Sequence, residues 1–208
     1  MTAICTNQHT VTGSQATYES EATENQPPPP VPEIQDPLFK KLATCCHLYK
    51  GAWETLEFLG DRIITSCIWK IAEPKYLKKY CARTVLPSIQ HIATNKILAA
   101  YCLKLGIYEL NGMSPSKIKK RHADAFETYF GAFYLTNGEL ETCIYLDRLM
   151  TPLLDLIVGS VASGKKEPKD SYEITSNYFG MQWILDISKL TKRPRLGDEK
   201  RAKLKKKI

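Results

Sequence analysis

Apolar residues recur at helical spacing through most of the middle of the chain. One stretch covers residues 53–72 and stops before Pro74. A second covers residues 87–105, with Pro87 at its start and Gly106 as its stop. No segment alternates apolar and polar residues for long, as a half-buried strand would. The pattern therefore predicts an all-α fold.

A third helix has clear signals at both ends. Ser114 suits the N-cap, and Pro115 suits the first helical position. The periodic pattern then runs through Tyr134 and ends at Asn137 and Gly138. We therefore expect this helix to begin directly after Ser114.

A fourth helix covers about residues 139–158, where Pro152 is expected to introduce a kink. Together the four helices define a domain of about residues 37–160. Residues 161–188 are predicted to form an extension that docks on this domain. The apolar segment 171–190, which overlaps the extension, is compatible with either a helix or a strand.

Both ends of the chain differ from this domain in composition. Residues 1–36 contain no Lys or Arg and five acids, and they close in the run Pro27 to Pro30, which predicts a disordered acidic leader. The 208-residue chain has a net charge of +7, and residues 189–208 alone carry ten basic and two acidic residues, a balance of +8. This basic tail is predicted to be disordered. Its charge suits binding to a phosphate backbone or to a transport receptor, and the alternative is that the tail serves only solubility. The tail residues expected to contact a nucleic-acid backbone are Lys192, Arg193, Arg195, Lys200, Arg201, Lys203, Lys205, Lys206 and Lys207.

Three features bear on the compartment. No stretch approaches about 18 uninterrupted apolar residues, so no membrane-spanning helix is predicted. The chain does not open like a secretory signal, and its acidic leader is the reverse of a mitochondrial transit peptide. Because the basic tail resembles a bipartite nuclear signal, we expect a nuclear protein, with the cytoplasm as the alternative.

The seven cysteines are scattered along the chain. No Cys-x-x-Cys pairs with another, so neither a zinc ribbon nor a disulfide framework is predicted, and a reducing compartment fits best. The cluster Cys45, Cys46 and His47 has two interpretations, a metal site or two small apolar residues on a buried helix turn.

Acidic side chains gather on one face of the predicted helix at residues 54–63. At 100° per residue, Glu54, Glu57 and Asp61 fall within an arc of about 60°, while the segment's leucines and isoleucine face the opposite way. Like charges on one arc repel by a few tenths of a kcal/mol per pair. A divalent cation is the obvious way to offset this repulsion.

A second acidic arc is predicted on the helix at residues 120–134. Asp124 and Glu127 share one face, aromatic residues occupy the other, and Gly131 removes bulk beside the acids. Each arc alone is also compatible with a solvated face. If the two arcs face each other, four or five carboxylates make a hard-oxygen site that suits Mg²⁺ or Mn²⁺, and two such ions act on phosphodiesters.

The string ETLEFLGDRI resembles the signature of ribonuclease III. The second arc, with Lys120, Ala123, Asp124 and Glu127, is similar to that family's other acidic motif. Between them, ATNKILAAYCLKLGI resembles the family's Ser-Asn-x-x-Leu helix, with Thr in place of Ser. The order and spacing match over about residues 38–158, and the end of the leader is similar to nuclear fungal members.

This resemblance implies a ribonuclease III-like helical domain that hydrolyses phosphodiesters of double-stranded RNA in RNA processing. It implies a Mg²⁺-dependent two-metal mechanism, with Mn²⁺ as a possible substitute and no small-molecule cofactor. The implied metal ligands are Glu57, Asp61, Asp124 and Glu127.

The resemblance also assigns supporting roles. Glu54 is implied to be an outer acid that positions water or a second ion, and Lys120 to stabilise charge on the phosphate or the leaving oxygen. Phe58 lies on the acid side of its helix, where an apolar ring needs a cover. The family places its signature at a dimer interface, so we expect a homodimer whose interface includes Phe58.

Two alternatives remain open. The first is a catalytically inactive ribonuclease III-like subunit that binds RNA in an assembly such as a mitochondrial ribosome. The second is an unrelated helical bundle whose acids coincide by chance. Only 48 residues follow residue 160, too few for a further compact domain, so we expect the basic tail to supply RNA-backbone affinity.

Overall fold

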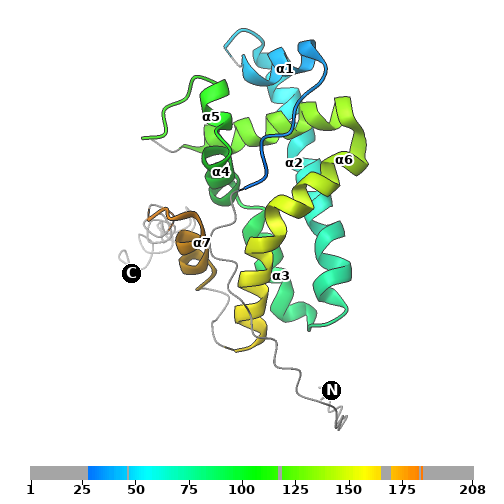
Figure 1. The fold of residues 1–208 in the computed structure, drawn as a ribbon, viewed down its shortest axis with the longest axis vertical. Coiled ribbons are helices and arrows are strands. Elements are labelled where there is room, and N and C mark those ends of the chain that lie inside the picture. The colour runs from blue at the N-terminus through cyan, green and yellow to red at the C-terminus, as the bar shows by residue number, and fades with distance from the viewer. Residues whose placement is uncertain (1–27, 46, 117–118, 165–169, 183, 185–208) are drawn as a thin grey trace, which may run out of the picture.

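The computed structural model describes residues 28–45, 47–116, 119–164, 170–182 and 184. These residues form helices joined by turns and contain no strand, so the prediction of an all-α fold is confirmed (Figure 1). The elements are α1 (Pro37–Thr44), α2 (Lys50–Ala72), η1 (Glu73–Leu77), α3 (Ala82–Ile92), α4 (Asn95–Lys104), α5 (Ile107–Leu110), α6 (Lys120–Ala162) and α7 (Ser171–Phe179). None of the helices in these ranges is both long and apolar enough to cross a membrane.

Two long helices, α2 and α6, form the centre of the fold and cross with their backbones in contact (Figure 1). A Cβ atom added to Gly60 would lie 1.8 Å from the carbonyl oxygen of Glu127, and one added to Gly131 would lie 2.2 Å from that of Leu56. Only glycine allows so close an approach. The two glycines therefore fix where the acidic faces of the helices meet.

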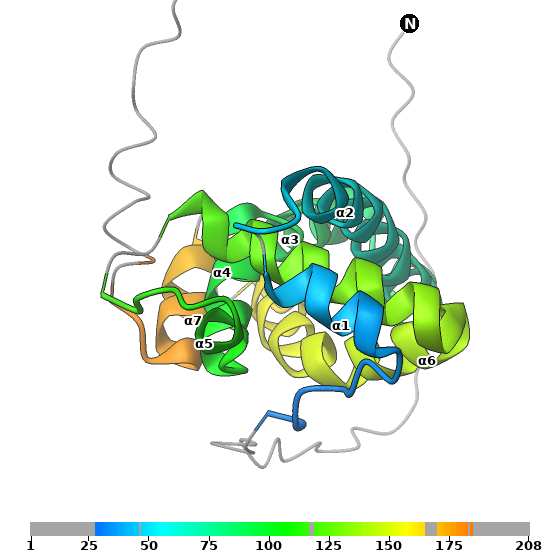
Figure 2. The ribbon, with the colours of Figure 1, turned by 90° about the horizontal axis from the view of Figure 1, so that it is seen from above.

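The core lies where α2, α4 and α6 pack together. Ile68, Tyr101, Phe126 and Phe130 are fully buried there, and α4 is buried over most of its length because its sequence is apolar almost all round. Figure 2 shows α1 lying against α6. This packing makes α6 the element against which most of the others are placed.

The segment predicted as one helix over residues 87–105 is two helices, α3 and α4. Thr94 adopts extended backbone angles between them, and its hydroxyl donates a hydrogen bond to the His91 carbonyl at 2.8 Å. Pro87 lies inside α3 and not at a helix start. The prediction was wrong because the apolar pattern continues across a break that a single threonine makes.

The predicted start of the third helix at Ser114 is also wrong. The helix α6 begins at Lys120, and Ser114 instead belongs to a turn in which its hydroxyl contacts that of Ser116 at 2.8 Å. The buried His122 holds the beginning of the helix, since its Nδ1 accepts from the Lys119 N–H at 3.1 Å.

A break in α6 falls at Gly138, where the predicted third helix ends. Its φ of 84° and ψ of 174° are not helical, and glycine adopts this positive φ without steric cost. Pro152, the expected kink, keeps helical backbone angles. The α6 helix therefore has two segments, before and after Gly138.

The end of the predicted leader is part of the fold. Tyr129 and Tyr145 on α6 donate their hydroxyl protons to the carbonyls of Pro32 at 2.8 Å and Pro30 at 2.9 Å. Ile34 is fully buried, and Asp36 caps α1 by accepting from the Leu38 N–H at 2.7 Å. The prediction of disorder up to residue 36 is therefore wrong for residues 28–36, while residues 1–27 lie outside the described part.

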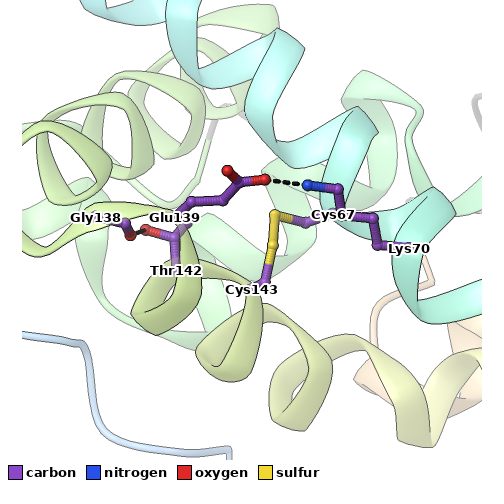
Figure 3. The surroundings of a disulfide bond; sticks show 6 residues. All are labelled: Cys67, Lys70, Gly138, Glu139, Thr142 and Cys143. Atoms are coloured by element: carbon purple, nitrogen blue, oxygen red, sulfur yellow. Dashed lines mark hydrogen bonds and ion pairs between the residues drawn. A yellow bond between two sulfur atoms is a disulfide. The ribbon is translucent and has the colours of Figure 1, made fainter.

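Covalent and ionic links join α2 to the second segment of α6. Cys67 and Cys143 form a disulfide, and Lys70 pairs with Glu139 beside it (Figure 3). Further along, Tyr76 in η1 donates to Asp155 at 2.7 Å. The sequence predicted no disulfide framework, and it did not reveal this single pair, because spacing rules detect neighbouring cysteines and these two are 76 positions apart.

The Cys45 to His47 cluster does not lie within a helix. Cys45 follows the last residue of α1 and is half-buried, and His47 is exposed; Cys46 lies outside the described residues. The interpretation as a buried helix turn is therefore wrong for Cys45.

The segment 171–190, whose type the pattern left open, begins with the helix α7. Thr175 in α7 lies 2.8 Å from Nε2 of the buried His91, and the Lys104 ammonium lies 4.2 Å from the ring centre of Tyr178. Phe179 meets Tyr101 edge to face at 4.9 Å. These contacts dock α7 on α3 and α4, and the described chain stops at Ile184, before the basic tail.

Candidate metal centre

The crossing of α2 and α6 brings together three carboxylates from the two acidic arcs. Carboxylate oxygens of Glu57, Asp124 and Glu127 all lie within 4.8 Å of one another. Gly60 and Gly131 make this possible, since any larger residue there would separate the two helix backbones. We call these three residues the acidic trio. It contains no thiol or imidazole, so the atoms available to bind a metal are hard oxygens, which Mg²⁺ and Mn²⁺ prefer.

Glu127 is the buried member of the trio, with 4% of its surface exposed. Burial, together with the negative charges of Asp61 and Asp124, raises the pKa of Glu127 to about 8. Within the described residues, no side-chain donor lies at hydrogen-bond distance from this carboxylate. A carboxyl group held among other acids is costly to ionise, and a bound cation would reduce that cost.

Lys120 partly neutralises the trio from the first turn of α6. Its ammonium donates to Glu57 Oε1 at 3.2 Å and also to Asp124. The hydrogen bond to Asp124 is the main reason that the pKa of Lys120 is raised. The lysine thus bridges two acids of the trio.

Two members of the trio, Glu57 and Glu127, line an open hollow with a volume of about 540 Å³. Acidic and basic side chains predominate in its lining, which consists of Glu54, Glu57, Phe58, Asp61, Asn95, Lys120 and Glu127. The hollow is therefore polar and open to solvent, as a site for a charged polymer would be.

Asn95 also lines the hollow, although no role was predicted for it. It is the first residue of α4, and the break at Thr94 turns it toward the hollow. The signal was present in the Thr-Asn pair, since threonine is a preferred residue just before a helix. The predicted continuous helix over 87–105 concealed it.

The two remaining predicted acids lie at the rim of the hollow. Asp61 lines it and pairs with Arg62 at 3.8 Å, and its charge acts on Glu127. Glu54 lines it and pairs with Lys50 at 3.8 Å. Of the four predicted metal ligands, the structure therefore brings three together and places Asp61 beside them.

Phe58 stands on the same rim and is 64% exposed. The Arg62 guanidinium lies 5.3 Å from the centre of its ring. Single exposed apolar side chains are common on protein surfaces, so what marks this ring is its position at the edge of the hollow. The basic tail residues predicted to bind RNA lie outside the described part of the chain.

Comparisons with known proteins give no assignment. No family model matches the chain, and neither a curated protein nor a solved structure does so. The fold and the site therefore define a protein whose described residues are all-α, with an acidic hollow where two long helices cross.

Proposed function

We propose that the protein is a divalent-cation-dependent endonuclease of the ribonuclease III type that hydrolyses phosphodiester bonds in double-stranded RNA. One observation carries the proposal: carboxylates from two separate helices converge, and one of them, Glu127, is buried. The substrate class is supported by the likeness of both acidic motifs to ribonuclease III and by the polycationic tail.

The residues present fit Mg²⁺ or Mn²⁺. Glu57, Asp124 and Glu127 would hold the cation through oxygen, and the excess of negative charge around the hollow would be reduced. When bound, such ions supply Lewis acidity at the scissile phosphate and lower the pKa of the attacking water, with a second ion balancing the leaving oxygen.

The other residues of the hollow act on substrate and water. Asp61 and Glu54 at the rim can accept hydrogen bonds from the attacking water or hold a second cation. The Asn95 amide can donate to a phosphate or ribose oxygen. Lys120, on the opposite helix from these acids, supplies a positive charge for the phosphodiester.

The proposed active form is a homodimer. Phe58 presents a large apolar surface on the rim, and a second copy of the chain is the cover that the family resemblance suggests. A dimer would set two acidic hollows on one duplex, which accords with cleavage of both strands.

The test is cleavage of a labelled RNA duplex in Mg²⁺ by the full chain and by Glu127→Gln. Gln keeps the shape of the side chain but removes the anionic ligand, so we expect cleavage to be lost and duplex binding to be kept. Glu141→Gln, an exposed acid of α6 beyond Gly138, is the matched control and should cleave normally.

The outcomes separate the three interpretations. Duplex binding without cleavage by the wild-type protein would favour the catalytically inactive RNA-binding subunit. Absence of both binding and cleavage would favour an unrelated helical bundle. Equal cleavage by wild type and Glu127→Gln would show that Glu127 is not a ligand.

A further inference from the structure

Lys120 occupies the place between two acids where a cation is most needed. Its ammonium is within 3.2 Å of Glu57 and also bonds Asp124, while it makes no bond to Glu127 within the described residues. The trio is thus neutralised only in part.

The Lys120 side chain is free to leave this position. It is 63% exposed, whereas the Glu57 and Asp124 side chains that it bridges are 25% and 14% exposed. A lysine side chain has a flexible four-carbon stem, and its charged end is strongly hydrated in water. Releasing the ammonium therefore requires no change in helix packing.

We infer that Lys120 is the built-in counter-ion of the metal-free centre, which a divalent cation displaces when it binds to the same acids. The inference rests on the proposed function, because it assumes that the trio is the metal site. The oxygens of Glu57 and Asp124 cannot serve the ammonium and a metal ion fully at once, and the two cations repel each other. Metal binding therefore sets the Lys120 ammonium free, and only then is it available to an RNA phosphate.

Lys120→Met isolates this role, since methionine keeps much of the apolar stem and removes the charge. Lys70→Met is the matched control: Lys70 also bridges α2 and α6, through Glu139, but it lies outside the hollow. Both lysines are more than half exposed, so neither change should prevent folding.

The experiment measures Mn²⁺ affinity of the RNA-free full chain by titration calorimetry, with thermal unfolding in EDTA as a second measurement. We expect Lys120→Met to bind Mn²⁺ roughly tenfold more tightly than wild type, and Lys70→Met to match wild type. In EDTA, Lys120→Met should unfold at a lower temperature than wild type, and saturating Mn²⁺ should remove that difference.

The outcomes distinguish this inference from the proposed function. If wild type and Lys120→Met bind Mn²⁺ with equal affinity, the metal site stands and the counter-ion role is wrong. Weaker Mn²⁺ binding by Lys120→Met would mean that Lys120 positions the acids for the metal, and that result also overturns the counter-ion role. If neither protein binds Mn²⁺ at millimolar concentration, the proposed metal centre fails, and the inference fails with it.

Discussion

Glu127 is the residue on which the chemistry of the hollow depends most. It combines burial, two neighbouring negative charges and the absence of a donor among the described residues, and its pKa is raised to about 8. An acid whose folded-state pKa lies above its unfolded value holds its proton more tightly in the folded protein. The folded protein therefore loses stability as pH rises toward that pKa.

We predict that metal-free wild-type protein becomes less stable by about 2 kcal/mol between pH 6.5 and 8.5, and that Glu127→Gln shows little of this loss. The window starts at pH 6.5 to avoid the contribution of the buried His91, whose pKa is lowered from 6.5 to about 4. That contribution raises stability between about pH 4 and pH 6.5 and is constant above this range. Denaturant unfolding in EDTA at both pH values measures the effect. Parallel pH profiles for the two proteins would contradict it.

At the scale of elements, the crossing of α2 and α6 decides whether a site exists at all. The wheel of each helix predicts an acidic arc, but only the contact at Gly60 and Gly131 sets the arcs face to face. Beyond that crossing, the disulfide and the Lys70–Glu139 pair hold the second segment of α6 against the end of α2 (Figure 3).

Gly60→Ala should therefore destabilise the protein by at least about 3 kcal/mol, since its Cβ would overlap the Glu127 carbonyl oxygen. Gly159→Ala is the matched control, because Gly159 also lies inside a long helix, α6, but has open space where a Cβ would go. That change should be neutral or stabilise by up to about 1 kcal/mol. Urea unfolding of both variants tests the crossing, and similar midpoints would argue against it.

Cys143→Ser should lower the free energy of unfolding by about 2–4 kcal/mol, since the disulfide closes a long loop in the unfolded chain. Dithiothreitol should lower the stability of wild type by a similar amount and leave Cys143→Ser unchanged. Cys81→Ser, an exposed free cysteine, is the control for loss of a thiol. A wild-type midpoint that does not respond to dithiothreitol would show that the two thiols are not joined in solution.

At the scale of the whole molecule, the proposed function needs surfaces beyond the hollow. Under that proposal, Phe58 on the rim packs against a second copy of the chain, and the basic tail binds the RNA backbone.

For the partner, we predict that Phe58→Ala shifts the protein from dimer toward monomer and reduces duplex cleavage in step. Leu140→Ala is the control, since Leu140 is 71% exposed on α6 without lining the hollow. Sedimentation velocity at micromolar concentration measures the shift. A wild-type monomer that cleaves long duplexes at full rate would rule out the dimer.

For the tail, we predict that a protein ending at residue 188 binds duplex RNA with a weaker salt dependence. If four of the ten basic residues contact phosphates, the slope of log K against log salt should fall by roughly 3–4 units, taking the RNA duplex to behave like DNA. Cleavage should recover at low salt. An unchanged slope with altered localisation of a fluorescent fusion would mark the tail as a nuclear address instead.

The sequence by itself determined the helical class, the acidic faces on α2 and α6, and the break near Gly138, because each depends on neighbours a few residues apart. Periodicity and special backbone angles are local properties, and they can be read in order along the chain. The same local patterns gave wrong helix boundaries in two places. Thr94 separates α3 from α4, and the turn that His122 stabilises places the start of α6 at Lys120.

Only the tertiary structure decided which acids meet. Glu57 and Glu127 come together, and Asn95 joins their hollow, because two glycines let distant helices touch. Tertiary packing also forms the disulfide between Cys67 and Cys143, and it places two tyrosine hydroxyls against the proline carbonyls that they bond. These contacts depend on how helices cross in space, and the residues that a crossing brings together need no particular spacing in the sequence.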